Sequence, residues 1–407
     1  MGTQFNFRIK NFYKSIYFLI ANVLLISACT AKNQANIPES ISSELLTGAE
    51  QMDLYLPKLE NKRVALVVNQ TSIVKDQHLV DTLLSKNVKI AKVFAPEHGF
   101  RGDADAGEHV KNSIDTRTQI PIISLYGDNK KPTAAQLADV DVIIFDIQDV
   151  GARFYTYIST LHYVMEACAE QNKQLLILDR PNPNGHYVDG PVLDMKFQSF
   201  VGMHPIPIVH GLTVGELATI INGEKWLPGG KECSLEIIKN QNYDHKTSYS
   251  LPVKPSPNLP NDQAIKLYPS LCFFEGTILS LGRGTHFPFQ VIGYPDELFG
   301  DFTFTPKSIV GMAKNPPYEN KTCYGLDLRN AELNENFTLK YLIDFYKLAP
   351  DKDKFFNAFF NKLAGNDKLQ KQIKEGMSES EIKKSWENDL QAYKNMRKQY
   401  LLYPDFN

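Results

Sequence analysis

The sequence is poor in the features that identify several common classes of protein. Only five cysteines occur in 407 residues, and they form no C-x-x-C pair, which excludes a zinc ribbon. Four common motifs are missing. They are the dinucleotide fingerprint G-x-G-x-x-G, the phosphate-binding loop G-x-x-x-x-G-K-[ST] of nucleoside triphosphatases, the esterase motif G-x-S-x-G and the zinc-peptidase motif H-E-x-x-H. A formal net charge of −2 offers no broad basic surface to nucleic-acid phosphates. We therefore expect no nucleotide or other cofactor and no nucleic-acid partner.

The N-terminal segment has the pattern of a bacterial lipoprotein signal. Basic residues precede an apolar core from Ile16 to Ile26, which is shorter than the ~20 residues of a membrane-spanning helix, and small residues lead into Cys29. We expect residues 1–29 to form the signal, with lipidation at Cys29, and residues 30–44 to form a polar tether. The pattern predicts a lipid-anchored lipoprotein of the cell envelope, on the periplasmic face; a plain cleaved signal peptide is the alternative.

Beyond the tether, short apolar runs alternate with amphipathic helical patterns. The expected strands are Arg63–Asn69, Lys89–Phe94, Ile120–Leu125, Val140–Ile147, Leu175–Leu178, Ile206–His210 and Leu235–Ile238. Strand, loop and helix in repetition predict an α/β fold, with a Rossmann-like parallel sheet domain over residues 45–254. The proline-rich stretch PVKPSPNLP marks the boundary to a smaller α+β C-terminal domain over residues 255–407, which ends in a long exposed helix over Glu381–Tyr400.

The loop Val93–Glu108 concentrates the side chains best suited to chemistry. It follows an expected strand and holds four carboxylates, one histidine, one arginine and three glycines. In an open α/β sheet, ligands bind outside the carboxyl ends of the strands. Glu97 lies beside apolar Phe94 and Phe100, where desolvation would favour the protonated carboxyl that a general acid needs. The alternative for Glu97 is a structural carboxylate that accepts backbone N–H groups of its own turn.

Polar residues at the ends of the other expected strands should converge on the same rim. The substrate-binding candidates on this rim are Asn69, His98, Arg101, Asp103, Tyr157, Arg180, Asn182, Asn184 and His210, and Asp149 adds a further carboxylate. A rim rich in carboxylates, amides and aromatics and poor in lysine suits a sugar. Glycoside hydrolysis needs a protonated carboxyl beside the leaving oxygen and a second carboxylate.

Two rival functions remain open. Asp103, Asp105 and Glu108 could bind a metal, and with Glu97 and His98 they would make a metal-dependent hydrolase, although the spacing of a calcium-binding EF-hand loop is not met. The other rival is a non-catalytic lipoprotein that binds peptidoglycan or another sugar. We expect no bound metal.

Eight segments in order carry a resemblance to a known family. They are FAPEHGFRGDADAGE, SLYG, FDIQDVGARFYTYISTL, LDRPNPNG, VDGPVLD, PIVHGLTVGELA, PSPNLP and FEGTILSLGRGT. From about Leu45 to its C-terminus the chain resembles the bacterial exo-β-N-acetylmuramidases, NamZ-like glycoside hydrolases formerly known as a domain of unknown function. The resemblance implies release of terminal β-linked N-acetylmuramic acid from the non-reducing end of peptidoglycan fragments during cell-wall turnover. It also implies a cleft between the two domains.

The resemblance also assigns roles to particular residues. The glutamate of the family's PEHG motif, thought to be catalytic, falls on Glu97, and Asp149 and Glu275 rank ahead of Asp103 as the second catalytic group. N-acetylmuramic acid carries a lactyl carboxylate, so its site should contain a cation able to bind it through two donors. The candidates in the matched segments are Arg153, Arg180 and Arg283.

Overall fold

The computed structural model describes residues 44–97, 99–101, 112–332 and 337–406. The chain divides into two compact units, Met1–Glu44 and Leu45–Asn407, and Glu44 is the one residue of the first unit that is described. The expected signal, the tether and Cys29 therefore lie outside the described residues, and the lipid anchor stays a prediction. Among the residues that are described, no helix is long and apolar enough to cross a membrane.

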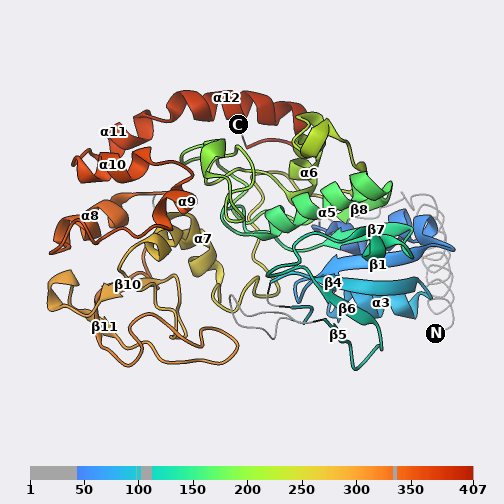
Figure 1. Ribbon diagram of the computed structural model, residues 1–407, viewed down its shortest axis with the longest axis horizontal. Helices are drawn as coiled ribbons and strands as arrows, with labels where there is room; N and C mark the ends of the chain where they lie inside the picture. Colours follow the sequence, from blue (N-terminus) through green and yellow to red (C-terminus); the bar gives the residue numbers. More distant parts are fainter. Residues whose placement is uncertain (1–43, 98, 102–111, 333–336, 407) are drawn as a thin grey trace, which may run out of the picture. The chain divides into compact units, whose positions relative to one another are not determined.

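A seven-stranded sheet forms the first part of the larger unit (Figure 1). Its strands stand in the order β5-β6-β4-β1-β7-β8-β9, and all neighbours pair in parallel except β5 with β6. The bounds are β1 Arg63–Val68, β4 Lys89–Ala95, β5 Ser113–Ile114, β6 Pro121–Ser124, β7 Val142–Asp146, β8 Gln174–Leu178 and β9 Ser234–Ile238, with a hairpin of β2 Ile73–Val74 and β3 Gln77–His78 beside it. The order turns around at β1, because the chain adds β4 and β6 on one side and then β7, β8 and β9 on the other. In open α/β sheets, ligands bind at such a reversal, outside the carboxyl ends of the central strands.

Two apolar layers hold the sheet between helices. Along β1, Val64, Leu66 and Val68 point into one layer, while Ala65 and Val67 point into the other, as the two-residue period of a strand requires. The first layer is covered by α2 Met52–Tyr55 and α3 Leu79–Ser85, and the second by α4 Ala134–Leu137, α5 Tyr157–Gln171 and α6 Val214–Gly223. The continuous apolar run of β1 follows from burial on both faces.

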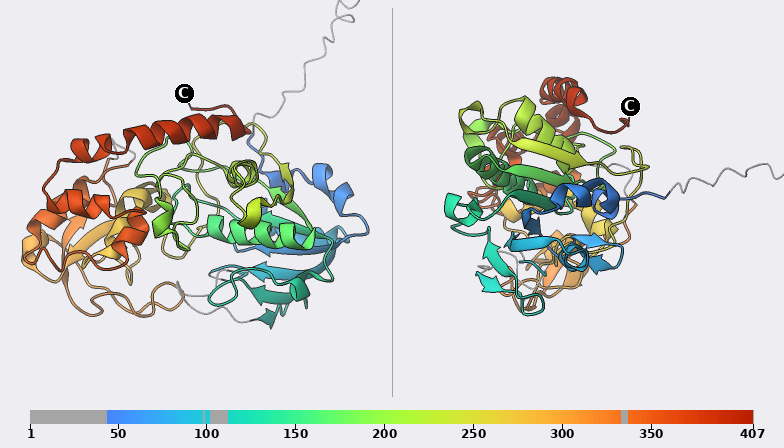
Figure 2. Two further views of the ribbon diagram at one scale, coloured as in Figure 1. Left: turned by 45° about the horizontal axis from the view of Figure 1, so that its top comes forward. Right: turned by 90° about the vertical axis from the view of Figure 1, so that its right-hand side faces the viewer.

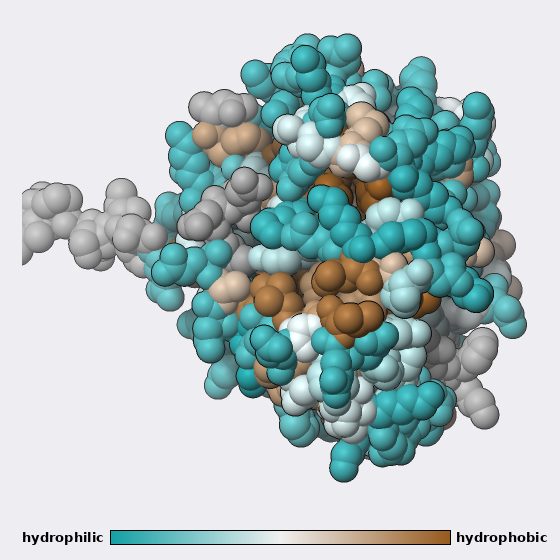
Figure 3. All heavy atoms as spheres, turned by 90° about the vertical axis from the view of Figure 1, so that its left-hand side faces the viewer, coloured by the Kyte–Doolittle hydropathy of each residue, from teal (hydrophilic) through white to brown (hydrophobic). Residues whose placement is uncertain are grey.

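The C-terminal part of the same unit is smaller and mixed. A three-stranded antiparallel sheet, β10-β12-β11, is formed by Val291–Tyr294, Cys323–Asp327 and Phe302–Phe304. The helices are α7 Asp262–Leu271, α8 Lys340–Leu348, α9 Phe360–Ala364, α10 Lys368–Lys374, α11 Glu379–Lys384 and α12 Glu387–Arg397, joined by short 3-10 helices such as η5 Cys272–Gly276. Figure 3 shows the face that lies at the left of Figure 1, where apolar side chains gather in the middle of the surface between polar borders.

Helix α12 runs back from the C-terminal part to the first sheet domain (Figure 2). The Tyr393 hydroxyl donates a hydrogen bond to the His210 carbonyl (2.7 Å), and Arg397 donates from Nε and Nη2 to the Gly211 carbonyl (2.9 and 2.6 Å). One hydrophobic core extends from the sheet helices into the C-terminal helices. The α/β fold with a smaller C-terminal region is confirmed, whereas the expected boundary between residues 254 and 255 stays a prediction.

Two expected elements are wrong in detail. Ile206–His210 is not a strand of the sheet, because this segment makes only isolated bridges, from Val209 to Ala152 and Asp189. The expected long helix over Glu381–Tyr400 is interrupted between α11 and α12 at Ser385 and Trp386, and the Trp386 side chain is buried there.

Candidate active site

The carboxyl ends of β1, β4 and β7 bring three predicted residues to one place. Asn69 follows β1, Glu97 follows β4, and Asp149 follows β7. Since β1 lies between β4 and β7 and the strands are parallel, their carboxyl ends share one edge of the sheet. The reversal of strand order is located there, which is where α/β folds bind their ligands.

Glu97 is held by hydroxyl groups from two other segments. The Tyr126 hydroxyl, which follows β6, donates to Glu97 Oε1 (3.1 Å), and the Thr156 hydroxyl, which precedes α5, lies 3.3 Å from Oε2. The Glu97 side chain is half-buried. Burial, followed by the neighbouring Glu97 charge, raises the pKa of Tyr126 above its usual value, so this tyrosine remains a hydrogen-bond donor at all physiological pH values.

Asp149 and His210 face each other in the interior. Asp149 Oδ2 accepts a hydrogen bond from the Gly151 N–H (2.7 Å) and lies 3.6 Å from His210 Nε2. His210 Nδ1 accepts from the Leu212 N–H (3.2 Å), which assigns the ring proton of the neutral imidazole to Nε2, on the side of the carboxylate. The second carboxylate oxygen, Oδ1, is buried and has no hydrogen-bond partner among the described residues.

Asn69 and Tyr157 complete the cluster. Asn69 Oδ1 accepts from the backbone N–H and the hydroxyl of Thr71 (2.9 and 2.6 Å), and this fixes the amide so that Nδ2 is the free donor. Asn69 Nδ2 and the Tyr157 hydroxyl are buried without a good hydrogen-bond partner in the described part of the chain. Burial raises the pKa of Tyr157 and the Glu97 charge raises it further, whereas the neighbouring Asn69 and Tyr155 side chains lower it.

Unpartnered buried polar atoms are costly, so a concentration of them requires an explanation. Here a donor amide, a hydroxyl and a carboxylate oxygen, on Asn69, Tyr157 and Asp149, have no hydrogen-bond partner among the described residues. The His210 Nε2 atom has only its 3.6 Å approach to Asp149 Oδ2. A sugar supplies both hydroxyl donors and acceptors, and an N-acetyl sugar adds an amide. The arrangement therefore suits a polar ligand rich in hydroxyl groups.

Two of the predicted arginines serve the fold instead of this site. Arg153 is fully buried, and its Nη1 and Nη2 donate at 2.7–3.1 Å to four backbone carbonyls, those of Pro191, Ile206, Leu363 and Ala364. Arg180 is also buried and forks onto the Asp146 carboxylate through Nε and Nη2 (2.5 and 2.9 Å). Neither guanidinium has a pair of free donors that could bind a lactyl carboxylate. The structure therefore contradicts the prediction that Arg153 or Arg180 binds this group.

Three further candidates have internal partners. The Asn182 amide donates to the Leu212 carbonyl (2.9 Å), and the Asn184 amide donates to the carbonyls of Val150 and Ile265 (2.8 and 3.2 Å). These two asparagines hold the loops around the site and do not offer open groups to a substrate. Arg101 pairs with Asp115 (2.9 Å) and lies over the ring of its neighbour Phe100, so it orders the edge of the rim.

Glu275 and Arg283 form an ion pair in the C-terminal part. Arg283 Nε and Nη2 approach Glu275 Oε1 at 2.7 and 2.6 Å, and the two side chains are 25% and 26% exposed. The Tyr268 ring, whose pKa is raised by burial and by nearby groups that include Glu275, packs edge-on against Tyr155 (5.9 Å between centroids). Tyr155 in turn packs against Tyr157 of the cluster (5.0 Å). Arg283 lies over the Phe289 ring, which packs against Tyr268, so several aromatic rings stand between the ion pair and Tyr157.

His98, Asp103, Asp105 and Glu108 lie outside the described residues, so their predicted roles stay predictions. Within the described ranges, no three His, Cys, Asp or Glu side chains gather as metal ligands would. The four cysteines that are described are buried and free, and Cys168 lies in the main hydrophobic core.

The sequence did not point to Tyr126 or Thr156. Tyr126 follows an expected strand directly, so the rule that placed Asn69 and Glu97 on the rim applies to it as well. Thr156 precedes α5 and has no comparable signal, because its contact with Glu97 depends on how α5 packs on the sheet.

Comparison with known proteins identifies the family of the chain. The family described as "Exo-beta-N-acetylmuramidase NamZ" matches with its N-terminal part at residues 64–263 and with its C-terminal part at residues 266–403. A curated relative, the "Peptidoglycan beta-N-acetylmuramidase NamZ" of Bacillus subtilis (strain 168), is 34% identical over 416 residues, which cover 96% of this chain and 100% of the relative.

Two crystal structures of DUF1343 family proteins from Bacteroides fragilis NCTC 9343 share the fold. One is 50% identical with a TM-score of 0.83 and covers 89% of this chain and 99% of its own. The other is 28% identical with a TM-score of 0.76 and covers 88% and 99%. The match over nearly the whole chain, together with the ordered motifs around Glu97, shows that the chain belongs to the exo-β-N-acetylmuramidase NamZ family.

Proposed function

We propose that this chain is an exo-acting glycoside hydrolase that releases terminal β-linked N-acetylmuramic acid from the non-reducing end of peptidoglycan fragments. The observation that carries the proposal is the grouping of Glu97 and Asp149 with open, buried polar atoms where the strand order reverses. Membership of the exo-β-N-acetylmuramidase family supports the same substrate class.

Glu97 is the general acid of the proposed reaction. Its carboxyl gives a proton to the glycosidic oxygen while the bond from that oxygen to the anomeric carbon breaks. Water then supplies the hydroxyl that ends on the anomeric carbon and the proton that restores the Glu97 carboxyl. The Tyr126 and Thr156 hydroxyls beside Glu97 stabilise the carboxylate that this proton transfer leaves behind.

Asp149 is the second carboxylate. Its Oδ1 is the open oxygen, while the Gly151 N–H and His210 occupy the side of Oδ2. A carboxylate in this position stabilises the positive charge that develops on the sugar ring, or acts on the anomeric carbon or on water. Glu275 is the weaker candidate because Arg283 already binds its carboxylate.

Arg283 is the proposed reader of the lactyl carboxylate. It is the one of the three predicted arginines whose side chain retains exposure, at 25%, whereas Arg153 and Arg180 have their donors directed into the interior. Substrate binding at Arg283 would exchange part of its pairing with Glu275 for pairing with the lactyl group. The proposed place of action is the periplasmic face of the cell envelope, with Cys29 as the lipid anchor.

The test is hydrolysis of a chromogenic β-N-acetylmuramide beside the matching N-acetylglucosaminide. Wild type, Glu97→Gln, Asp149→Asn and EDTA-treated wild type are assayed in parallel, with circular dichroism to show that each variant is folded. We expect turnover of the muramide only, survival of turnover in EDTA, loss of turnover in Asp149→Asn, and a loss in Glu97→Gln that grows with the basicity of the leaving group. Turnover that EDTA abolishes would favour the metal-dependent rival, and peptidoglycan binding without any turnover would favour the binding-protein rival.

A further inference from the structure

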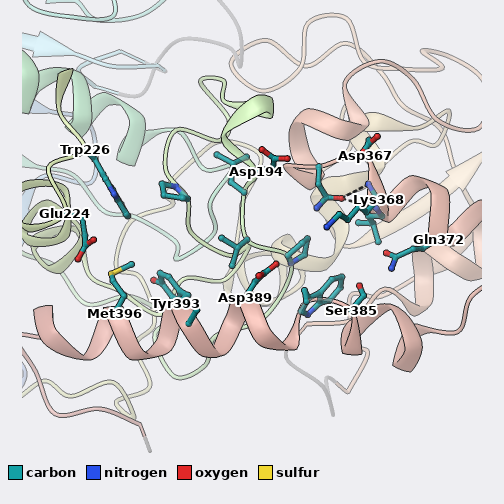
Figure 4. A pocket seen from close by; sticks show the side chains of 18 residues that line it. Asp194, Glu224, Trp226, Asp367, Lys368, Gln372, Ser385, Asp389, Tyr393 and Met396 are labelled. Carbon is teal, nitrogen blue, oxygen red and sulfur yellow. Dashed lines mark hydrogen bonds between the residues drawn. The ribbon is translucent and has the colours of Figure 1, made fainter. Parts of the chain in front are cut away.

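A separate cavity lies against α12, and Tyr393, whose hydroxyl donates to the His210 carbonyl, is one of the residues that line it. It has a volume of about 570 Å³ and is enclosed by α12, α10, the segment 191–194 and the turn after α6 (Figure 4). Ligand pockets typically measure ~300–1,000 Å³. None of Asn69, Glu97, Asp149 and Tyr157 lines this cavity. We call it the tryptophan cavity, because Trp226 and Trp386, the two tryptophans of the chain, both line it.

Trp226 is the aromatic platform of the tryptophan cavity. Its ring is half-buried and stacks on the His204 ring, with 5.5 Å between centroids and an interplanar angle of 25°. The stacking fixes the orientation of the indole, and Figure 4 shows it directed into the cavity. An indole that is already ordered loses little conformational entropy when a ligand packs on it, and pyranose rings pack their C–H faces on such surfaces.

Carboxylates also line the tryptophan cavity. Figure 4 shows Asp194, Glu224 and Asp389 at the cavity, contributed by three different segments. Glu224 accepts from the Tyr400 hydroxyl through Oε1 (2.6 Å). Asp389 is exposed and has no hydrogen-bond or ion-pair partner among the described residues. Carboxylate oxygens next to an aromatic face can accept hydrogen bonds from the hydroxyl groups of a stacked sugar.

The charge of the lining selects among sugars. Four carboxylates line the cavity against one ammonium group, that of Lys368; the carboxylates are Asp194, Glu224, Asp367 and Asp389. Asp367 is paired with Lys371 and is thereby partly neutralised. The remaining negative charge repels an anionic sugar such as N-acetylmuramic acid, so the cavity and the active site differ in preference.

We propose that the tryptophan cavity is a second saccharide site, which binds an uncharged pyranose chain with one ring stacked on Trp226 and with hydroxyl groups of the chain bonded to Asp389 and Glu224. The site holds saccharide and performs no chemistry. The inference rests on the lining of the cavity and not on the proposed hydrolase activity.

The chain provides its own probe of this site. Because both tryptophans line the cavity, tryptophan fluorescence of the full chain reports on occupancy without a label. The N-acetylglucosamine trimer is titrated first, then N-acetylmuramic acid, and then the glucosamine trimer, whose free amines make it cationic. We expect a saturable change in emission with the N-acetylglucosamine trimer and no change with N-acetylmuramic acid over the same concentrations.

Two variants of α12 localise the effect. Asp389→Asn removes the unpaired carboxylate and should weaken binding about tenfold, the usual loss for one charge-assisted hydrogen bond. Glu387→Gln is the matched control, since Glu387 is an exposed residue of the same helix that does not line the cavity. Glu97→Gln should leave the titration unchanged, whatever its effect on hydrolysis.

Three results would overturn the inference. The first is no saturable change with the N-acetylglucosamine trimer, and the second is a change that Asp389→Asn and Glu387→Gln weaken equally. The third is tighter binding of the glucosamine trimer, which would make the cavity an amine site. A titration that Glu97→Gln abolishes would place the saccharide in the active site and would also refute the inference.

Discussion

Replacing Arg153 by lysine separates a structural role from substrate recognition. The guanidinium donates from Nη1 to two carbonyls and from Nη2 to two more, in segments 38 to 211 residues away along the chain. A lysine ammonium places its donors on one atom and cannot span both pairs. If one pair is left unsatisfied, at about 1.5 kcal/mol for each buried carbonyl, Arg153→Lys should lower the free energy of unfolding by about 3 kcal/mol.

The assay is urea unfolding followed by circular dichroism, with Arg283→Lys as the matched control. We expect Arg153→Lys to unfold at lower urea concentration while its folded fraction still prefers the muramide to the glucosaminide. Arg283→Lys should do the reverse, because its side chain is partly exposed and is the proposed reader of the lactyl group. An unchanged unfolding curve for Arg153→Lys, combined with lost discrimination between the two sugars, would refute the structural role of Arg153.

Two further predictions concern residues next to the site. Burial lowers the pKa of His78 from 6.5 to about 4, because it outweighs the hydrogen bond to the Asn69 carbonyl. The stability that neutral His78 contributes is therefore complete above pH 6.5 and is lost as the pH falls to 4. Urea unfolding should therefore show wild type losing about 3 kcal/mol more than His78→Gln between pH 7 and pH 4, and equal losses would contradict this. Tyr126→Phe removes a hydrogen-bond donor to Glu97 and no proposed contact with the sugar. We therefore expect kcat for the muramide to fall roughly tenfold with little change in KM. A large rise in KM with unchanged kcat would instead make Tyr126 a binding residue.

The sheet and the core of the site follow from local features of the sequence. Continuous apolar runs such as that of β1 predict strands buried on both faces. Because the carboxyl ends of parallel strands share one edge of the sheet, the residues that follow them, Asn69, Glu97 and Asp149, are then expected on the same rim. His210 also reaches the cluster, although the strand expected before it does not form. The segment is extended and buried, and only its pairing differs from the expectation.

The roles of the arginines depend on contacts between distant segments. Arg153 and Arg283 both lie in matched motifs, and the sequence gives no reason to separate them. The carbonyls that bind Arg153 include those of Leu363 and Ala364, more than 200 residues further along the chain. A matched motif indicates that a side chain has a role in the family, but it does not distinguish a structural role from substrate binding. Tertiary packing decides whether the side chain points into the core or toward a substrate.

The most direct test of the central claim, that Glu97 is the general acid of N-acetylmuramic acid release, varies the leaving group. A general acid matters most when the leaving oxygen is strongly basic, as in a natural saccharide, and least for a dinitrophenyl glycoside, which departs without protonation. Wild type and Glu97→Gln are compared on both substrates. We predict that the substitution lowers kcat/KM on the natural saccharide by at least about 100-fold more than on the dinitrophenyl β-N-acetylmuramide. Equal losses on the two substrates would contradict the assignment of Glu97 as the acid.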